Sequence, residues 1–461
     1  MPGFWAKHFG DPLAVKASED LLEGSKKIGE LLETPEKLSE KKIEQFREAA
    51  VELDLGLKDL LDQGGGYLTS KEIQDVRSLL DRVQKFLDQL PPAAKPESAK
   101  APEKLPPFRS ESASLESEGH PEHNEDRAFA DDEHAFYGVL DGVAGSLDGE
   151  AAARLGKEIM VNHAADFEGL DVAQTKRQLA DIFNECRQAL LEQSPKIYRQ
   201  TFLKSVRQHT EKPRHTLIDT TATIVKLVAD EAGKERAVVA HAGDSRLYRF
   251  NRKSGELKQL TFDHTPVLLD TAEKYGREAA LKFQDLLNRL ESYDQWQAIR
   301  SIKERARRGE KLYAPEEQGA LRFTDEEIAF IDGHGLEAEI VEYLKGTQRP
   351  REVVAKTLID QPEITDFELA EGDELLLTSD GIHDNLTADE IQQILAGDLD
   401  LLEDPAVQSA ALKAGEIQAE RLAAAAQARS RDRNSERAKP DDMTAVQIVL
   451  GQPRAAKQQA A

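Results

Sequence analysis

Two apolar runs of this sequence end in the same pair of residues, an aspartate followed by a glycine. The run AFYGVLDG ends at Asp141-Gly142, and the run ELLLTSDG ends at Asp380-Gly381. Each predicts a buried strand with a carboxylate at its tip, and the glycine lets the backbone turn sharply. If the two strands are neighbours, the carboxylates converge, and like charges at short distance must take up protons or bind cations. A metal site is the expected resolution.

Three further motifs place acidic residues at expected strand edges or turns. They are His123-Asn124-Glu125-Asp126-Arg127, Gly243-Asp244-Ser245-Arg246, and Asp441-Asp442-Met443-Thr444. Any one of them could be an ordinary turn, because aspartate and glycine suit tight turns. A sandwich of sheets would gather all of them at one end. Oxygen ligands without a cysteine cluster favour Mg²⁺ or Mn²⁺ over zinc. Two such ions can ionise a water and neutralise a phosphoryl group under attack.

The composition limits the classes of function. With 461 residues, the chain is long enough for two or three domains. A net charge of -25 argues against a nucleic-acid-binding surface or an anionic membrane partner, but not against a phosphorylated substrate held through cations. The one cysteine, Cys186, cannot form an intramolecular disulfide, which favours a cytoplasmic location. The N-terminal residues lack a signal-peptide pattern, and no run of about 18 apolar residues predicts a membrane span.

The first 90 residues are expected to form a helical module. Apolar residues recur at steps of three and four over 39–61 and again over 71–90, and three consecutive glycines, 64–66, separate the two series. This predicts a coiled-coil-like hairpin of two helices. The hairpin could simply pack on its neighbours or could dock a partner helix. Residues 91–107 contain six prolines and predict an extended linker.

From residue 108 to 451 the sequence predicts an α+β domain, followed by a tail at 452–461. Short β-rich runs come in consecutive pairs, with helical stretches between them, which favours two antiparallel sheets with helices on the outer faces, an α-β-β-α sandwich. Residues 265–365 are mostly helical and form an expected insertion. Residues 406–438 are rich in alanine and glutamine, and predict one long helix that ends before Pro440.

The motifs in their order resemble one known family. NEDR, VLDGVAGSLDGEAA, DTTAT, AHAGDSRLYRF with LTFDHT, LLLTSDGIHDNL and DDMTAVQIVL follow one another over residues 109–451, apart from the insertion. The sequence resembles bacterial metal-dependent protein phosphatases of the type 2C (PPM) family. The resemblance implies the two-sheet sandwich, and hydrolysis of phosphoserine and phosphothreonine by a water that bridges two Mn²⁺ or Mg²⁺ ions.

The resemblance also implies roles for individual residues. Asp141 would bridge two metals, and Gly142 would offer its main-chain carbonyl to one of them. Glu125 would be a ligand of the second metal, and its neighbour Asp126 would act on that metal through water. The ligands of the first metal would be Asp380 and Asp441, and Asp244 would belong to a third, weaker metal position. Thr220, Thr221 and Arg246 would shape the sheet and its turns.

Two positions depart from the family pattern. Many members have an arginine that clamps the substrate phosphate where this chain has Pro121, and some have a proposed general-acid histidine where it has Val143. The nearby candidates for phosphate binding are Arg127, His120 and His123. His123 and His264 are the candidates for proton donation, although a structural role would suit each of them. Histidine cannot reproduce the bidentate grip of a guanidinium.

Three functions stay open at this point. The leading one is an active serine/threonine phosphatase that acts on phosphorylated proteins. The others are an inactive scaffold with the same fold and a phosphomonoesterase for small metabolites. The N-terminal helices or the 265–365 insertion could bind a protein partner, and the insertion could restrict access to the cleft.

Overall fold

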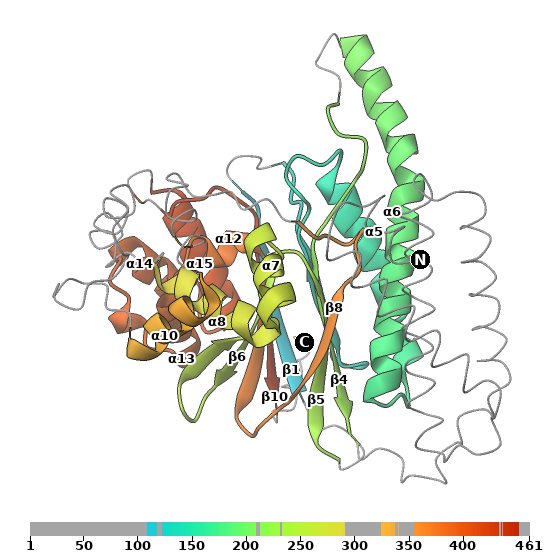
Figure 1. Ribbon diagram of the computed structural model, residues 1–461. Coiled ribbons are helices and arrows are strands. Elements are labelled where there is room, and N and C mark those ends of the chain that lie inside the picture. The colour runs from blue at the N-terminus through green and yellow to red at the C-terminus, as the bar shows by residue number, and fades with distance from the viewer. Residues whose placement is uncertain are drawn as a thin grey trace, which may run out of the picture. The chain divides into compact units, whose positions relative to one another are not determined.

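The computed structural model describes residues 108–117, 122–208, 213–230, 233–290, 324–336, 340, 355–432, 435 and 437–450 (Figure 1). All of these belong to the unit Pro102–Ala461. The helical hairpin expected in residues 1–90, the linker 91–107 and the tail 452–461 lie outside the described residues, so they stay predictions.

The centre of the domain is a sandwich of two five-stranded antiparallel sheets. The first sheet has the order β1 (Phe108–Leu115), β10 (Met443–Leu450), β9 (Asp373–Thr378), β6 (Arg246–Asn251) and β7 (Glu256–Gln259). The second has the order β2 (Arg127–Asp131), β3 (Phe136–Leu140), β4 (Ala222–Ala229), β5 (Glu235–Ala242) and β8 (Glu363–Glu368). The antiparallel sandwich predicted from the sequence is confirmed.

Helices cover the outer faces of both sheets. Packed on the second sheet are α5 (Gly149–Asn162) and α6 (Val172–Gln208), with the short η2 (Ala164–Phe167) between them. On the first sheet lie α12 (Asp380–His383), α13 (Ala388–Ala396), η4 (Leu399–Leu401), α14 (Pro405–Lys413) and α15 (Gln418–Ser430). The insertion contributes α7 (Pro266–Tyr275), α8 (Arg277–Leu290) and α10 (Asp325–His334), which share a hydrophobic cluster of their own.

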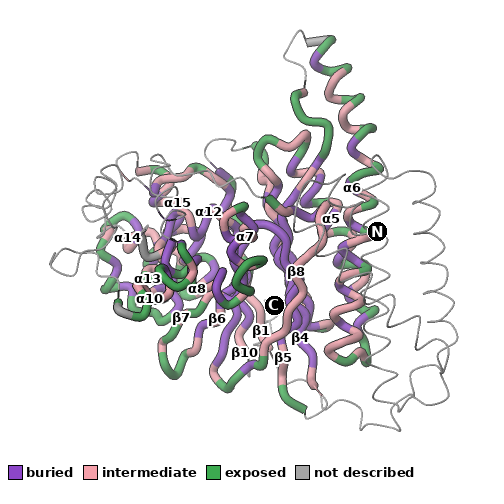
Figure 2. The backbone as a smooth tube through the Cα atoms, in the orientation of Figure 1, coloured by how far each residue is buried: buried purple, intermediate pink, exposed green. Residues whose placement is uncertain are grey.

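The alternation of side chains along each strand builds two kinds of core. In β3, Tyr137 and Val139 face the other sheet, while Phe136 and Leu140 pack under the helices. Both faces of the central strands are therefore buried, as Figure 2 shows. This explains why these strands have continuous apolar sequences and not alternating ones.

Two expectations about elements need correction. The single helix expected over 406–438 is two helices, because the chain turns at Gly415 with a φ of +95°, a value that glycine adopts without strain. The helical insertion was expected to extend to residue 365, but residues from Glu363 onward belong to strand β8, which pairs with β5.

Candidate metal centre

The sandwich brings the acidic motifs to one end. Asp141 follows β3, Asp380 follows β9, and Asp244 lies in the turn between β5 and β6. Glu125 and Asp126 come just before β2, and Asp441 comes just before β10. The sequence raised the possibility that strands β3 and β9 are neighbours. They are not, because they lie in opposite sheets. Their carboxylates meet because both strands run toward the same end of the sandwich.

Asp141 is held in place by two threonines at the start of β4. The main-chain oxygen of Asp141 accepts hydrogen bonds from Thr220 Oγ1 at 2.7 Å and from Thr221 N at 2.8 Å. Its neighbour Gly142 packs directly on Gly149 at the start of α5, where a Cβ on Gly142 would lie 2.6 Å from the Gly149 carbonyl carbon. Loss of surrounding water raises the pKa of the Asp141 carboxyl well above its usual range, and Asp126 and other nearby carboxylates add to the shift.

Asp126, whose charge acts on Asp141, is only 3% exposed. Ser379 Oγ donates a hydrogen bond to its Oδ2 at 2.6 Å, whereas its buried Oδ1 has no hydrogen-bond partner among the described residues. Burial raises the pKa of Asp126 to about 7, and the neighbouring charges of Asp441 and Asp442 contribute to this rise. A buried carboxylate oxygen without a donor is costly unless a proton or a cation satisfies it.

Asp442 has a positioning role that the sequence analysis did not assign. Its Oδ1 accepts a hydrogen bond from Ser117 N, and its Oδ2 accepts one from Glu125 N, both at 2.6 Å. The side chain is 2% exposed, so these are buried charge-assisted hydrogen bonds. Asp442 thereby fixes the main chain at Glu125, the predicted ligand of the second metal.

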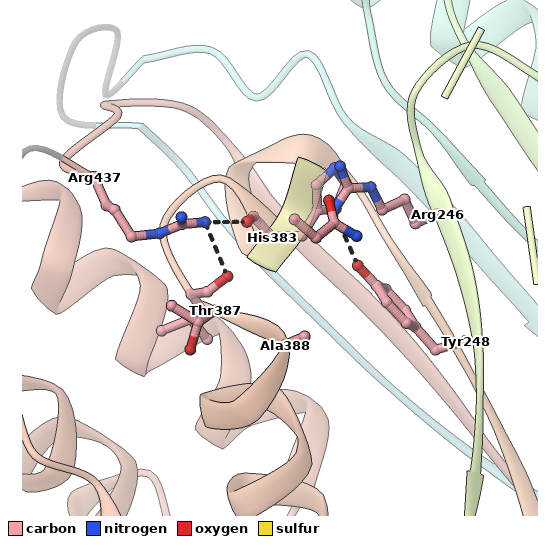
Figure 3. A pocket seen from close by; sticks show the side chains of 8 residues that line it. Arg246, Tyr248, His383, Thr387, Ala388 and Arg437 are labelled. Atoms are coloured by element: carbon pink, nitrogen blue, oxygen red, sulfur yellow. Dashed lines mark hydrogen bonds between the residues drawn. The ribbon is translucent and has the colours of Figure 1, made fainter. Parts of the chain in front are cut away.

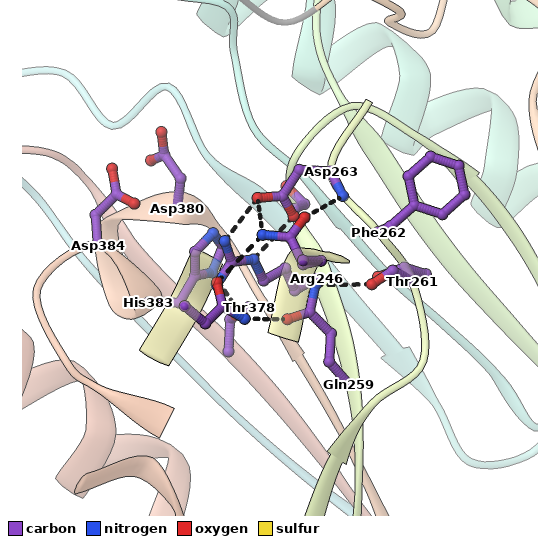
Figure 4. Close-up of polar contacts among 12 residues, drawn as sticks. Arg246, Gln259, Thr261, Phe262, Asp263, Thr378, Asp380, His383 and Asp384 are labelled. Atoms are coloured by element: carbon purple, nitrogen blue, oxygen red, sulfur yellow. Dashed lines mark hydrogen bonds and ion pairs between the residues drawn. The ribbon is translucent and has the colours of Figure 1, made fainter. Parts of the chain in front are cut away.

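Lys439, which the sequence did not single out, lies among the carboxylates of Asp380, Asp384 and Asp441. The ammonium of Lys439 contacts Asp380, and lies 2.9 Å from Asp384 Oδ2 and 3.1 Å from Asp441 Oδ2. Partial burial raises the pKa of Asp380 well above its usual range, although Lys439 opposes the shift. Asp380 Oδ1 is buried without a hydrogen-bond partner among the residues described. Figure 4 shows Asp380, the first residue of α12, and Asp384, which directly follows that helix.

The donor set consists of carboxylate oxygens without a cysteine, which suits a hard divalent cation. Across the described ranges, no three side chains of His, Cys, Asp or Glu stand together in a geometry that could hold a metal ion. Several carboxylates point instead to the Lys439 ammonium. The charges of Asp126, Asp244, Asp380 and Asp441 all lie near enough to Asp141 to raise the pKa of its carboxyl. These five aspartates and Asp384 are called the acidic cluster below, and the Lys439 ammonium contacts three of its members, Asp380, Asp384 and Asp441.

The turn that carries Asp244 is fixed by polar contacts below it. Gly243 has a φ of +122°, and a Cβ there would overlap the side chain of Thr221. Ser245 Oγ lies 2.8 Å from Thr221 Oγ1, which ties the turn to β4. Loss of surrounding water raises the pKa of Asp244 to about 7, and the nearby Asp263 adds to the shift.

A buried ion pair joins this turn to the insertion. Arg246 donates from Nε to Asp263 Oδ1 at 2.8 Å and from Nη2 to Oδ2 at 2.6 Å. Gln284 of α8 accepts from Asp263 N at 3.0 Å and donates to Asp263 Oδ2 at 3.2 Å. The prediction that Arg246 shapes the sheet and its turns agrees with these contacts.

A small cavity lies next to this ion pair. Arg246, Tyr248 and His383 line one side of it, and Thr387 and Arg437 line the other (Figure 3). Its volume of about 10 Å³ is enough for one water molecule but not for a phosphate ester. The cavity is therefore a feature of the packing under the acidic cluster and not a substrate pocket.

His264 is fully engaged inside the protein. It is 1% exposed, its Nδ1 accepts from Gly243 N at 3.2 Å, and its Nε2 lies 3.5 Å from Glu363 Oε2. The ring centroids of His241 and His264 are 4.5 Å apart and the rings are tilted at 48° to each other. Burial lowers the pKa of His241 to about 3. These contacts support the structural role that was the alternative to proton donation.

Three other candidates for phosphate or proton chemistry remain. His120 lies outside the described residues, and Arg127 and His123 lie near the start of α5. Arg127 is half-buried, donates from Nη2 to Glu150 Oε1 at 2.8 Å, and donates from Nη1 to the main-chain oxygen of Asp126 at 2.7 Å. His123 is 64% exposed, with Nδ1 3.8 Å from Glu150 Oε2. Arg127 thus holds the loop that carries Asp126, and its predicted contact with phosphate stays a prediction, as does the role of His123.

A two-sheet sandwich with carboxylates gathered at one end is the arrangement that the type 2C resemblance implies. A family model described as protein phosphatase 2C matches residues 116–415. The chain therefore belongs to the protein phosphatase 2C family, and the resemblance drawn from the motifs is confirmed.

Solved structures of bacterial phosphatases are also similar to this chain. The serine/threonine phosphatase PstP/Ppp of Mycobacterium tuberculosis has 20% identity, covers 75% of this chain and 99% of its own, and has a TM-score of 0.41. The PstP catalytic domain in complex with 2 manganese ions has the same identity and coverage, with a TM-score of 0.39. PppA of Pseudomonas aeruginosa has 17% identity, coverage of 75% and 99%, and a TM-score of 0.39. A comparison with curated proteins found no match.

None of the helices in the described part of the chain combines the length and the apolar character needed to cross a bilayer.

Proposed function

We propose that this protein is a metal-dependent serine/threonine phosphatase that hydrolyses phosphomonoesters on proteins. The observation that carries the proposal is the convergence of carboxylates from both sheets. Asp126, Asp141, Asp244 and Asp380 all have raised pKa values, so holding them ionised together without a cation is costly. Membership of the protein phosphatase 2C family supports the reaction class.

The residues that would hold the metals are those that the family resemblance implies. Asp141, Asp380 and Asp441 would provide carboxylate oxygens, together with Glu125, Asp126, Asp244 and the carbonyl of Gly142. Hard oxygen donors of this kind suit Mn²⁺ or Mg²⁺, and we propose two ions with a third, weaker position at Asp244. When bound, such cations supply Lewis acidity toward water and toward the phosphoryl oxygens.

The protein's own contribution is to fix these oxygens before any substrate binds. Thr220 and Thr221 hold the main chain at Asp141, and Ser379 orients Asp126. Asp442 fixes the main chain at Glu125. Preorganised groups of this kind lower the cost of reorganisation during the reaction.

The single cysteine, Cys186, which is buried and unpaired, supports a cytoplasmic location.

The proposal is tested by hydrolysis of an aryl phosphate in the presence of Mn²⁺. We expect metal-dependent turnover by the wild type, and a loss of at least about 100-fold in Asp141→Asn and in Asp380→Asn, because each variant removes one charge from the cluster. Asp166→Asn is the matched control, since this aspartate is 52% exposed and paired with His163. Turnover that is unaffected by both cluster variants would exclude the metal mechanism.

One observation favours the second candidate function, a non-catalytic scaffold. The Lys439 ammonium already neutralises part of the acidic cluster. A wild type that is as inactive as Asp141→Asn, yet still binds phosphoproteins, would support the scaffold. Phosphopeptides that are hydrolysed, and that compete with the aryl phosphate as substrates, would support the phosphatase.

The insertion is proposed to restrict the cleft to particular phosphoprotein partners. It is tied to the site through Gln284, which contacts Asp263, and through Arg277, which contacts Glu363. Removal of residues 291–323 leaves α8 and these contacts in place. We expect hydrolysis of a phosphoprotein to change much more than hydrolysis of an aryl phosphate, whereas equal changes would show that the segment does not set specificity.

A further inference from the structure

Lys439 is the one described lysine that contacts three carboxylates of the acidic cluster, and its main chain is anchored. Lys439 N donates to Asn385 Oδ1 at 2.9 Å, and Asn385 Nδ2 donates to the main-chain oxygen of Lys439 at 2.9 Å. Asn385 is fully buried, so this double contact fixes the base of the lysine side chain against the end of α12. The ammonium therefore reaches the carboxylates from a rigid support.

The chemistry of an ammonium suits this position. It is a compact charge with three donors, and it meets oxygens of Asp380, Asp384 and Asp441. The lysine side chain is 23% exposed, so a path to solvent remains open to it. A divalent cation that binds Asp380 and Asp441 would lie within a few ångströms of this ammonium. Like charges at that distance repel strongly where water is partly excluded.

We propose that Lys439 is a built-in competitor of the divalent cation on the Asp380–Asp441 side of the cluster. In the metal-free protein, its ammonium lies beside these carboxylates and stabilises them. A metal ion binds there only when the ammonium turns away toward solvent, so the apparent affinity is reduced by the fraction of molecules in which the ammonium has moved. This inference rests on the proposed function, because it assumes that Asp380 and Asp441 are metal ligands.

The test compares Mn²⁺ binding and metal-free stability in four proteins. Isothermal titration gives the Mn²⁺ dissociation constant, and thermal unfolding in EDTA gives the stability without metal. Lys439→Met keeps the bulk of the side chain and removes its charge, and Lys439→Arg keeps the charge. Lys253→Met is the matched control, since it removes the same charge from an exposed lysine that is paired with Glu371.

We expect Lys439→Met to bind Mn²⁺ at least about tenfold more tightly than the wild type, and to unfold at a lower temperature in EDTA. Lys439→Arg and Lys253→Met should behave like the wild type. Folding of Lys439→Met only in the presence of Mn²⁺ would also support the inference, because the carboxylates then lack any other cation.

Two results would overturn the inference, and they differ in what they say of the proposed function. If the wild type binds Mn²⁺ and Lys439→Met binds it equally or more weakly, Lys439 is not a competitor, while the metal site stands. If none of the four proteins shows saturable Mn²⁺ binding, both the inference and the proposed metal mechanism are wrong.

Discussion

The buried ion pair between Arg246 and Asp263 provides a quantitative test of how the turn at Asp244 is supported. The two side chains are 10% and 8% exposed, and two hydrogen bonds of 2.8 and 2.6 Å join them. Arg246→Met leaves Asp263 buried with only Gln284 as a side-chain partner, and Asp263→Leu leaves Arg246 buried without its carboxylate. Each single change is expected to lower the free energy of unfolding by about 3–5 kcal/mol, the usual cost of an unpaired buried charge.

The double variant should cost much less than the sum of the two single changes. When Arg246→Met and Asp263→Leu are combined, no unpaired charge is left in the interior, so we expect a coupling energy of about 3 kcal/mol. Urea unfolding at pH 7 in EDTA measures all the variants without a contribution from metal binding. A parallel cycle on the exposed pair Lys253–Glu371 should show no measurable coupling. Costs that simply add at Arg246 and Asp263 would refute this account of the turn.

The remaining predictions concern three other positions. Asp442→Ala removes the acceptor of two buried main-chain N–H groups, those of Ser117 and Glu125, and should lower the free energy of unfolding in urea by about 3–5 kcal/mol; unchanged stability would contradict its positioning role. Gly381→Ala places a Cβ against the main-chain carbonyl of Asp442, so a lower melting temperature and weaker Mn²⁺ binding are expected, and an unaltered melting curve would count against the close packing. For Glu363, burial opposes ionisation, but bonds from His264 and Arg277 lower its pKa to about 2 from 4.5. Because a lowered folded-state pKa stabilises the protein above the unfolded-state value, the cost of Glu363→Gln should fall from about 3 kcal/mol at pH 7 to about 1 kcal/mol at pH 3; a cost that is independent of pH would disprove this.

The central strands could be predicted from the sequence because both of their faces are buried. All five residues of β3 (FYGVL) and all six of β9 (DELLLT) are buried, so β3 gives an unbroken run of apolar residues and glycine, and β9 gives three consecutive leucines. Strand β1, with the sequence FRSESASL, and β8, with EITDFE, escaped prediction because both lie at sheet edges and bury little apolar surface. What makes them strands is pairing with β10 and β5, far away in the sequence. Pairing of this kind leaves no local pattern.

In the candidate site too, residues with a local sequence signal could be predicted, and residues placed by tertiary contacts could not. Asp141, Asp244 and Asp380 were identifiable because a carboxylate beside a glycine at the end of an apolar run is a local signal. Lys439 gave no such signal, because two of its three carboxylate partners, Asp380 and Asp384, are far away in the sequence and meet it only in the tertiary fold. Asp384 lay within a quoted motif, SDGIHDNL, without a role being assigned to it. Tertiary contacts, and not residue type, decide which polar side chains reach the cluster.

The central claim is that carboxylates from both sheets jointly bind divalent cations. The most direct test is anomalous diffraction at the manganese edge from crystals of the wild-type protein soaked in Mn²⁺. The account predicts anomalous peaks within coordination distance of Asp141, Asp380 and Asp441, with the Lys439 ammonium displaced from Asp380. Manganese peaks found only at surface carboxylates, with Lys439 still seated among Asp380, Asp384 and Asp441, would contradict it.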